Sequence, residues 1–258
     1  PIVNLVSMAQ DEELAAVVPV REFADDRFLL FSTRLGRIKK TPLSAYSNIR
    51  SVGLNAININ EDDRLIDVQI VEPDSEVILA TRQGMAIRFP ESATRTMGRA
   101  TAGVRGIRLR GDDEVVGMVV TRVGANLLVV TAKGMGKRTE VDAYRLQGRG
   151  GYGVINVRVT EKTGEVVSIK SVSDDEQLML ITRNGVVNRQ KVAEIRTIGR
   201  ATQGVRLVNL DKGDAVMDVA RMAVEDDELE EGDLVEGEFE EADLVDDRAD
   251  DLVEGDDE

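Results

Sequence analysis

The stretch FLLFSTRLGRIKK at 28–40 decides the fold, because the chain repeats its pattern three more times. The other copies are VILATRQGMAIRF at 77–89, LLVVTAKGMGKRT at 127–139 and LMLITRNGVVNRQ at 178–190. Each copy has an apolar run, a threonine, two further residues, a glycine and a second run. Successive glycines lie 48, 50 and 51 residues apart. An apolar strand, a short polar turn with glycine where a positive φ is needed, and a returning strand predict a β-hairpin in each copy.

A second recurring element follows each hairpin. Nineteen residues after each hairpin glycine come Asn55, Gly103, Gly153 and Gly204. From the second copy onward this element reads GVRGIRL, GVINVRV or GVRLVNL, an alternation typical of a half-buried strand. Acidic turns at 61–63, 112–114 and 174–176 punctuate further valine-rich strands. Each unit of about fifty residues therefore supplies about four short strands, the size of a propeller blade.

The regular spacing predicts an all-β fold of repeated four-stranded blades, arranged as in a propeller. A β-solenoid or a sandwich is the competing architecture. The segment PIVNLVSMAQDEELAAVVPV at 1–20 matches the second half of a unit and lacks its hairpin, so the first blade is expected to be incomplete. Because the chain opens with Pro1 rather than methionine, we interpret it as a piece of a longer polypeptide.

The net charge of -15 averages two unlike regions. Residues 225–258 hold 20 of the 48 acidic residues and one of the 33 basic ones, so the preceding residues carry 28 acids and 32 bases, a net of +4. We therefore expect a mildly basic β-domain at 1–222 and an acidic, disordered tail at 223–258. The tail either aids solubility or competes with an anionic ligand for the basic domain.

The composition excludes several kinds of site. The chain has no Cys and no His, which removes disulfides, thiolate and imidazole metal sites, and Ser-His-Asp triads. No catalytic or metal-binding residue is expected, and no GxxxxGK[ST] loop for nucleotide hydrolysis is present. No apolar run approaches the roughly 18 residues of a membrane span, and the start lacks the charge of a signal peptide. A soluble, cytoplasmic, non-catalytic chain is expected.

Basic residues recur at equivalent places in the repeat. If the blades are equivalent, such residues lie on one edge and form a spaced band that neutralises phosphates without reading bases. The alternative is that they keep surface strands soluble and protect their edges. Four residues after each hairpin glycine stand Lys40, Arg88, Arg138 and Arg189, two copies add Lys39 and Lys137, and the following loops carry Arg50, Arg99, Arg149 and Arg200.

The loop LQGRGGYG at 146–153 is the most distinctive of the repeat loops. Its glycines would let the backbone approach a phosphate closely and add N–H donors. Tyr152 would rest against a sugar or pack on the blade beneath. The alternative is a flexible connection between blades. The candidate residues of this loop are Gln147, Gly148, Arg149, Gly150, Gly151, Tyr152 and Gly153.

PIVNL, the TxxGxxxK/R hairpins, MGRATAGVRGIRL and IGRATQGV, in this order, resemble the C-terminal domain of the DNA gyrase A protein over residues 1 to about 222. The resemblance implies a β-pinwheel whose basic rim wraps double-stranded DNA and so supports ATP-dependent negative supercoiling. The implied partners are DNA, the rest of gyrase A, and gyrase B in an A2B2 complex near the bacterial nucleoid. No cofactor is implied in this chain: ATP and Mg belong to the holoenzyme, and the cleaving tyrosine lies upstream.

The chain departs from this family at its hallmark box, QRRGGKG, which precedes the first complete hairpin and is not contained here. QGRGGYG at 147–153 matches the box except at Gly148 and Tyr152, which stand where the box is basic. Two rivals remain. The related protein of topoisomerase IV shares the blades and bends DNA without full wrapping, and a propeller could also serve as a protein-interaction platform.

Overall fold

The computed structural model of the protein describes residues 14–48 and 53–222. The chain divides into two compact units, Pro1–Val224 and Glu225–Glu258, and every described residue belongs to the first. The predicted acidic tail lies outside the described residues. Those residues form β-strands and short 3-10 helices and contain no α-helix, so the all-β class is confirmed. None of the helices in this part of the chain is long and apolar enough to cross a membrane.

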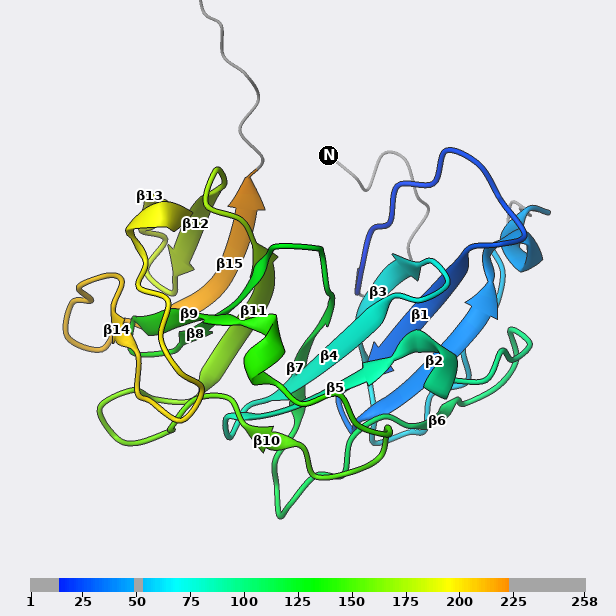
Figure 1. The fold of residues 1–258 in the computed structure, drawn as a ribbon, viewed down its shortest axis with the longest axis horizontal. Coiled ribbons are helices and arrows are strands. Elements are labelled where there is room, and N and C mark those ends of the chain that lie inside the picture. The colour runs from blue at the N-terminus through cyan, green and yellow to red at the C-terminus, as the bar shows by residue number, and fades with distance from the viewer. Residues whose placement is uncertain (1–13, 49–52, 223–258) are drawn as a thin grey trace, which may run out of the picture. The chain divides into compact units, whose positions relative to one another are not determined.

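The strands and 3-10 helices recur in the same order along the chain (Figure 1). They are β1 (Phe28–Thr33), β2 (Arg37–Pro42), η2 (Leu43–Tyr46), β3 (Leu65–Val71), β4 (Glu76–Thr81), β5 (Met85–Pro90), η3 (Glu91–Ala93), β6 (Val104–Arg105), β7 (Val115–Val120), β8 (Asn126–Thr131), β9 (Met135–Glu140), η4 (Val141–Ala143), β10 (Val154–Ile155), β11 (Val166–Val172), β12 (Gln177–Thr182), β13 (Val187–Lys191), η5 (Val192–Glu194), β14 (Val205–Arg206) and β15 (Val216–Met222).

All four predicted hairpins are present as antiparallel pairs: β1 with β2, β4 with β5, β8 with β9, and β12 with β13. Their shared threonine and glycine make the turn. In the first hairpin the N–H of Gly36 donates to the carbonyl of Thr33 at 3.0 Å, and Gly36 adopts a φ of 78°. The Thr33 hydroxyl accepts a further bond from the N–H of Arg37 at 3.2 Å. The TxxG spacing therefore encodes a closed turn with a left-handed glycine.

Each complete blade borrows its outermost strand from the following unit. The sheet orders are β3-β1-β2-β6 for blade 1, β7-β4-β5-β10 for blade 2 and β11-β8-β9-β14 for blade 3. β6 follows the second hairpin in sequence but pairs with β2 of the first, and β10 and β14 behave likewise. Blade 4 has the order β13-β12-β15, three strands among the described residues. The predicted four-stranded blades are confirmed, with the refinement that one strand is exchanged between successive units.

The first unit needs a correction in its alignment. The repeat spacing places Asn55 level with Gly103, Gly153 and Gly204, but Gly53 is the structural equivalent, with a φ of 76° against 75°, 73° and 81°. The N–H of Asn58, five residues after Gly53, donates to the carbonyl of Thr101 at 3.1 Å. Arg108 and Arg158 make the corresponding bonds at 2.8 and 2.9 Å. The first unit is therefore two residues shorter in this loop than the other three.

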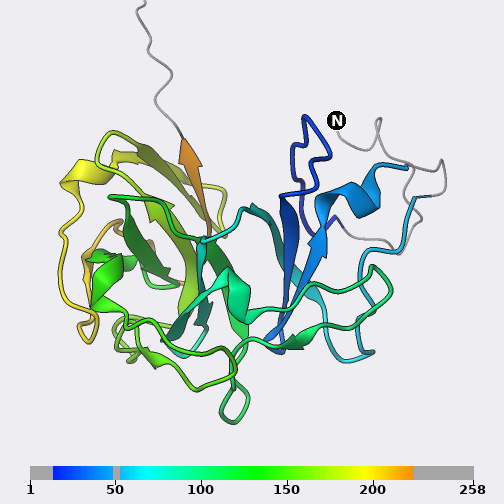
Figure 2. The same cartoon turned by 45° about the vertical axis from the view of Figure 1, so that its right-hand side comes forward.

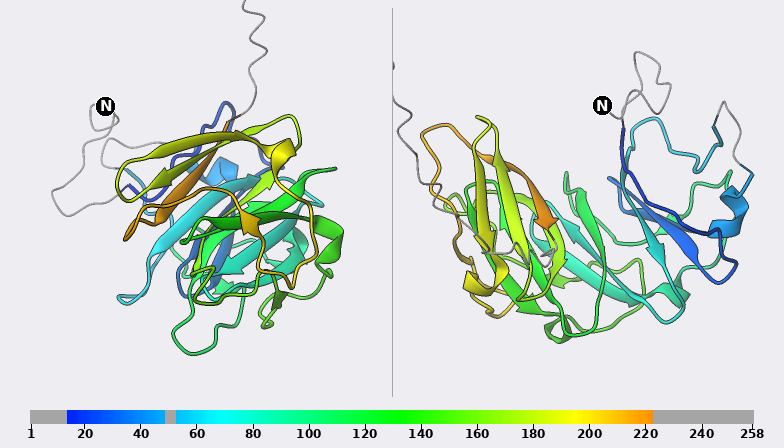
Figure 3. Two further views of the ribbon diagram at one scale, coloured as in Figure 1. Left: turned by 90° about the vertical axis from the view of Figure 1, so that its left-hand side faces the viewer. Right: turned by 90° about the horizontal axis from the view of Figure 1, so that it is seen from above.

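The core lies between neighbouring sheets and is almost wholly aliphatic. One cluster joins blades 1 and 2, a second joins blades 2 and 3, and a third joins blades 3 and 4. The strands β3, β7, β11 and β15 lie beside one another at the inner edges of the blades. The borrowed strands lie at the opposite, outer edges, and the four blades follow one another in chain order (Figures 2 and 3).

Candidate nucleic-acid interface

The predicted hairpin cations Lys40 and Arg138 reach across to the next unit. Lys40 Nζ forms an ion pair with the carboxylate of Glu91 in η3, and both side chains are less than a tenth exposed. Arg138 Nε donates to the carbonyl of Ile195, the residue after η5, at 2.7 Å. Both cations are 6% exposed. Because η3 and η5 belong to the following blades, these side chains tie one blade to the next.

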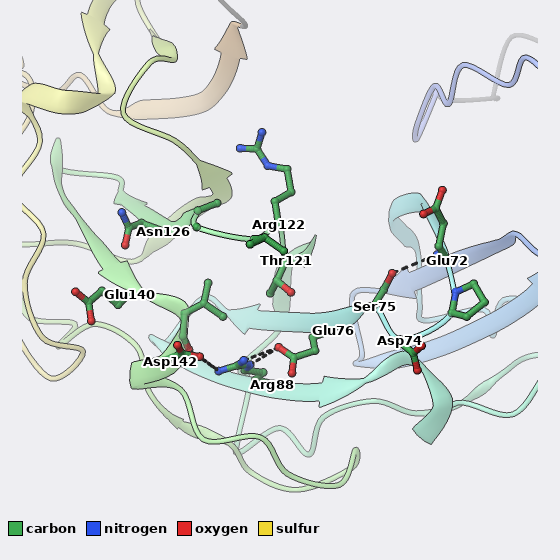
Figure 4. Close-up of a pocket in the computed structure, with 15 residues that line it drawn as sticks. Glu72, Asp74, Ser75, Glu76, Arg88, Thr121, Arg122, Asn126, Glu140 and Asp142 are labelled. Carbon is green, nitrogen blue, oxygen red and sulfur yellow. Dashed lines mark hydrogen bonds and ion pairs between the residues drawn. The ribbon is translucent and has the colours of Figure 1, made fainter.

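Arg88 makes the same connection between blades 2 and 3 (Figure 4). Its Nε donates to the carboxylate of Glu76 on β4 at 2.7 Å, and its Nη1 lies 3.1 Å from the carboxylate of Asp142 in η4. The same Nη1 donates to the carbonyls of Val141 and Tyr144 at 2.9 and 3.0 Å. The Arg88 side chain is 12% exposed and has partners on both blades.

The backbone repeats this connection. The carbonyl of each of these cations accepts a hydrogen bond from the loop that follows the next 3-10 helix. The bonds run from Met97 N to Lys40 O at 2.8 Å, from Gln147 N to Arg88 O at 3.0 Å, and from Ile198 N to Arg138 O at 2.9 Å. Direct phosphate binding by these residues stays an untested prediction, but their geometry gives them a structural role. Arg189, with no later blade among the described residues, is exposed and donates only to Gln177.

Lys39 and Lys137, the second pair of predicted hairpin cations, are fully buried. Lys39 Nζ donates to the carbonyls of Ala56 and Arg99, and Lys137 Nζ to those of Gly199 and Arg200. Burial, with the nearby Arg99 or Arg200 guanidinium, lowers the pKa of each ammonium from 10.5 to about 8. These lysines bind backbone carbonyls of the arginine loops and are not accessible to an external ligand. Direct contact with DNA by them stays a prediction that no observation favours.

The described loop arginines are half-buried, and two of them donate hydrogen bonds to backbone carbonyls. Arg149 donates to the carbonyls of Ala93 and Arg105 at 2.8 and 3.0 Å. Arg200 donates to the carbonyl of Ile155 at 2.9 Å, the position in its unit that corresponds to Arg105. Each side chain therefore lies along the outer strand of the preceding unit with part of its guanidinium accessible. Arg99 is half-buried as well, and Arg50 lies outside the described residues.

The glycines of the box-like loop fit it to the blade beneath, while their predicted approach to a phosphate stays untested. Gly150 and Gly153 have φ values of 80° and 73°. A Cβ on Gly153 would lie 2.2 Å from the carbonyl oxygen of Ala86, so only glycine lets the loop close on β5. Gly148 has open space around it, and Gly151 makes only ordinary contacts. The loop lies fixed against blade 2 through the bond from Gln147 to Arg88, rather than standing as a free connection.

Eight further arginines accompany the predicted Arg99, Arg149 and Arg200 in these loops. The segments 95–110, 145–159 and 195–210 each run from the end of a 3-10 helix through the outer strand, and together they contain 11 arginines and no acidic residue. The absence of acids in three equivalent segments is the signal that could have identified them. We call them the outer-edge arginines: Arg95, Arg99, Arg105, Arg108, Arg110, Arg145, Arg149, Arg158, Arg196, Arg200 and Arg206.

The outer-edge arginines differ from the other arginines in their partners. None of them forms an ion pair with another described residue. Eight of the eleven are exposed, and Arg99, Arg149 and Arg200 are half-buried. The paired arginines lie elsewhere: Arg27, Arg34, Arg82, Arg88, Arg122, Arg138 and Arg221. The outer edges of the blades therefore carry positive charge that no neighbouring carboxylate neutralises.

Carboxylates gather around other parts of the blades. Glu114 pairs with Arg34 and Arg82 at 3.3 and 3.4 Å, close to the hairpin turns. A cleft of about 600 Å³ beside Arg88 is lined by acidic residues from blades 2 and 3, among them Glu76 and Glu140 (Figure 4). Within the described ranges, no group of three His, Cys, Asp or Glu residues could hold a metal ion. This cleft is unsuited to a polyanion.

Successive blades that exchange a strand and carry unpaired arginines along their outer edges define a propeller with a cationic rim. The family model described as the DNA gyrase C-terminal domain, beta-propeller, matches residues 27–72, 75–122, 125–173 and 176–221, one match for each blade. The chain belongs to this family. The predicted resemblance and the β-pinwheel fold are thereby confirmed.

Similar proteins agree with this assignment. The chain is 57% identical over 238 residues to the DNA gyrase A protein of Halalkalibacterium halodurans, covering 92% of this chain and 29% of the relative. It is 40% identical over 250 residues to the DNA gyrase A protein of Escherichia coli K12, covering 95% of this chain and 29% of the relative. The chain thus spans under a third of the length of these relatives.

Two solved structures share the fold. The C-terminal domain of DNA topoisomerase IV aligns with a TM-score of 0.80 and 27% identity, covering 86% of this chain and 70% of that one. The DNA gyrase A C-terminal domain aligns with a TM-score of 0.77 and 26% identity, covering 85% and 74%. The fold therefore does not separate the two, whereas the relatives at 40% and 57% identity are both gyrase proteins. Topoisomerase IV is not the better-supported alternative.

Proposed function

We propose that this chain binds and wraps double-stranded DNA around its outer blade edges without sequence preference. The observation that carries the proposal is the set of eleven outer-edge arginines, which lie on three acid-free segments and have no carboxylate partner among the described residues. An unpaired guanidinium is a strong phosphate ligand because its planar donors match the phosphate oxygens. Repeating it on successive blades places such ligands at intervals along a curved edge.

The mode of binding follows from the kind of residue involved. Arginines spaced along a surface neutralise phosphates, and each neutralised phosphate releases counterions, so affinity falls steeply with salt. Bending a duplex of 20–30 base pairs costs roughly 1–6 kcal/mol, so wrapping requires contacts on several blades rather than on one. The outer edges of blades 1, 2 and 3 each carry one of the acid-free segments, because each outer strand is exchanged. The three segments together supply the contacts that offset the bending cost.

We further propose that the chain performs this role within the gyrase A protein and has no catalytic activity by itself. Its family membership and its share of the relatives' length support this view. In the holoenzyme, assembled with gyrase B as A2B2 near the bacterial nucleoid, the wrapped DNA segment would be presented for strand passage that introduces negative supercoils. ATP hydrolysis, its Mg and the cleaving tyrosine would come from other parts of that complex.

A topology assay tests the wrapping. The chain is bound to relaxed circular DNA, topoisomerase I is added, and the linking number is read after the protein is removed. Retained positive writhe that grows with the amount of protein supports the proposal. Binding without any change in linking number would favour the topoisomerase IV mode of bending, and no salt-dependent binding would favour a protein-interaction platform. Either result would overturn the wrapping function.

A further inference from the structure

Tyr152 of the box-like loop contacts two arginines of the preceding unit. The guanidinium carbons of Arg108 and Arg110 lie 5.2 and 4.6 Å from the centroid of the Tyr152 ring. The tyrosine is 41% exposed, and both arginines are exposed. The three side chains line one shallow hollow on the surface together with Gln83, Met85 and Asp113. Two like charges therefore share one aromatic ring at the outer edge of the blades.

The backbone brings these residues together. The N–H of Arg108 donates to the carbonyl of Gly151 at 2.8 Å, and the N–H of Gly150 donates to the carbonyl of Gly106 at 2.6 Å. The residue after Gly151 is thus held opposite Arg108, whatever its side chain. The same backbone bond recurs from Asn58 to Thr101 and from Arg158 to Thr202, and there the residues in the place of Tyr152 are Ala102 and Gln203. Only the middle of the three equivalent places carries an aromatic ring.

The charges of this cluster are available to a ligand. Neither the Arg108 nor the Arg110 side chain forms an ion pair or a hydrogen bond with another described residue. The carboxylate of Asp113 in the same hollow forms no ion pair with either arginine; its Oδ1 accepts the N–H groups of Gln83 and Glu114 at 2.9 Å each. Two adjacent guanidiniums repel one another unless an anion lies between them, and a phosphate has the oxygens to accept from both.

We propose that Tyr152 is a positioning residue that holds Arg108 and Arg110 beside the box-like loop, so that cations from two consecutive units bind one stretch of DNA backbone. The inference rests on the proposed DNA-binding function. It also explains how a loop with tyrosine at a position that is basic in the gyrase box would still present positive charge there. The charge comes from the neighbouring unit, and the ring fixes its place.

The test measures affinity for a labelled linear duplex as a function of salt, using the full 258-residue chain. The double variant Arg108→Ala/Arg110→Ala should lower the slope of log affinity against log salt by about two, since each phosphate contact contributes about 0.9. Tyr152→Leu should weaken binding about two- to fivefold, as expected for the loss of an exposed cation–π contact. Tyr152→Phe, which keeps the ring, should bind like the parent, and Gln203→Leu serves as the control at the equivalent place.

Combining the variants separates positioning from direct contact. Tyr152→Leu should have no further effect in the Arg108→Ala/Arg110→Ala background, because the ring acts only through the arginines. An equal loss in both backgrounds would mean that Tyr152 touches DNA itself, and would overturn the proposal. An unchanged slope in the arginine variant would overturn it as well. If the parent chain bound no DNA, the proposed function itself would fail. Nuclear magnetic resonance would then test the cluster separately: the Tyr152 ring should shift the Arg108 and Arg110 Nε–H resonances in the parent but not in Tyr152→Leu.

Discussion

The hairpin cations and the outer-edge arginines are alike in sequence and opposite in structure. The hairpin cations stand four residues after each hairpin glycine, and six of the outer-edge arginines also recur at constant distances from it. Arg95, Arg145 and Arg196 follow it by eleven residues, and Arg99, Arg149 and Arg200 by fifteen. Lys40 and Arg138 are 6% exposed and joined to the next blade, whereas Arg108, Arg158 and Arg206 on the outer segments are exposed. A cation that recurs in every repeat therefore indicates a recurring neighbour as readily as a recurring ligand. Its role is set by what packs on it.

The pairing pattern gives the comparison its physical meaning. A buried cation needs a partner inside the protein, because desolvating a lone charge costs several kcal/mol. Each described hairpin cation that has a following blade finds this partner on it, as Lys40 does with Glu91. Eight of the eleven outer-edge arginines are exposed, and none of the eleven pairs with a carboxylate among the described residues. They keep their charge for an external anion, so one set holds the blades together and the other is suited to bind DNA.

The largest expected effect comes from breaking a buried pair. Lys40→Met leaves the carboxylate of Glu91 buried without its cation, and we expect a loss of about 3–5 kcal/mol in unfolding free energy, measured by urea denaturation. Adding Glu91→Leu should recover most of this loss, because the pair is then replaced by apolar side chains. Under conditions where Lys40→Met remains folded, its DNA salt slope should equal the parent's. A stable variant with a slope reduced by about one would instead assign Lys40 to the DNA.

Removing outer-edge charge should weaken DNA binding but leave the stability of the fold almost unchanged. Replacing Arg95, Arg145 and Arg196 with Gln should weaken DNA binding about tenfold or more and lower the salt slope by about three. Unfolding free energy should change by no more than about 0.5 kcal/mol per substitution, since the side chains are exposed.

The matched control for that triple variant carries the same change of charge away from the outer edge. Arg27, Arg64 and Arg183 are exposed but lie outside the acid-free segments. Their replacement with Gln should leave the salt slope within about one of the parent's. Equal losses in the two triple variants would show that net charge, rather than the outer edge, determines binding.

A pH titration of stability tests whether Lys39 and Lys137 are buried as the structure shows. Burial lowers the pKa of Lys39 and Lys137 from 10.5 to about 8. Between pH 8 and pH 10.5 the unfolded chain therefore binds more protons at these two sites than the folded chain does. The unfolding free energy contributed by these sites should therefore rise with pH above about 8, by at most about 1.4 kcal/mol per pH unit and site. Comparing the parent with Lys39→Met/Lys137→Met isolates this contribution. A slope that is the same in both chains would contradict the lowered pKa values.

The smallest effect concerns the acidic tail. Residues 225–258 carry 20 acidic residues and one arginine, and we propose that they compete with DNA for the outer-edge arginines. Truncation after Met222 should raise DNA affinity about two- to fivefold at low salt, and the gain should vanish as screening shortens the range of the charges. Equal affinity of the complete and truncated chains at low salt would mean that the tail only aids solubility.

Much of the fold could be predicted because its signals are local. A left-handed glycine such as Gly84 three residues after Thr81 makes a closed turn wherever it occurs, so four copies predicted four hairpins. The exchange of the outer strand could not be predicted in this way. β6 pairs with a strand more than sixty residues earlier, and its own alternating sequence would suit either neighbour. The two-residue error at Asn55 arose because the loop of the first unit is shorter. The strand pattern after the loop is unchanged, so counting residues from the hairpin glycine misplaces the start of that strand.

The sequence alone determined the repeat and the hairpins, since both depend on residue type and spacing along the chain. Only the tertiary structure decided which cations are free. Lys40 and Arg138 look as accessible in sequence as Arg108, but η3 and η5 of the next blades cover them. Likewise, Tyr152 meets Arg108 and Arg110 only because a backbone bond joins two units. Burial is a property of what comes together in space, and a segment some fifty residues away supplies it.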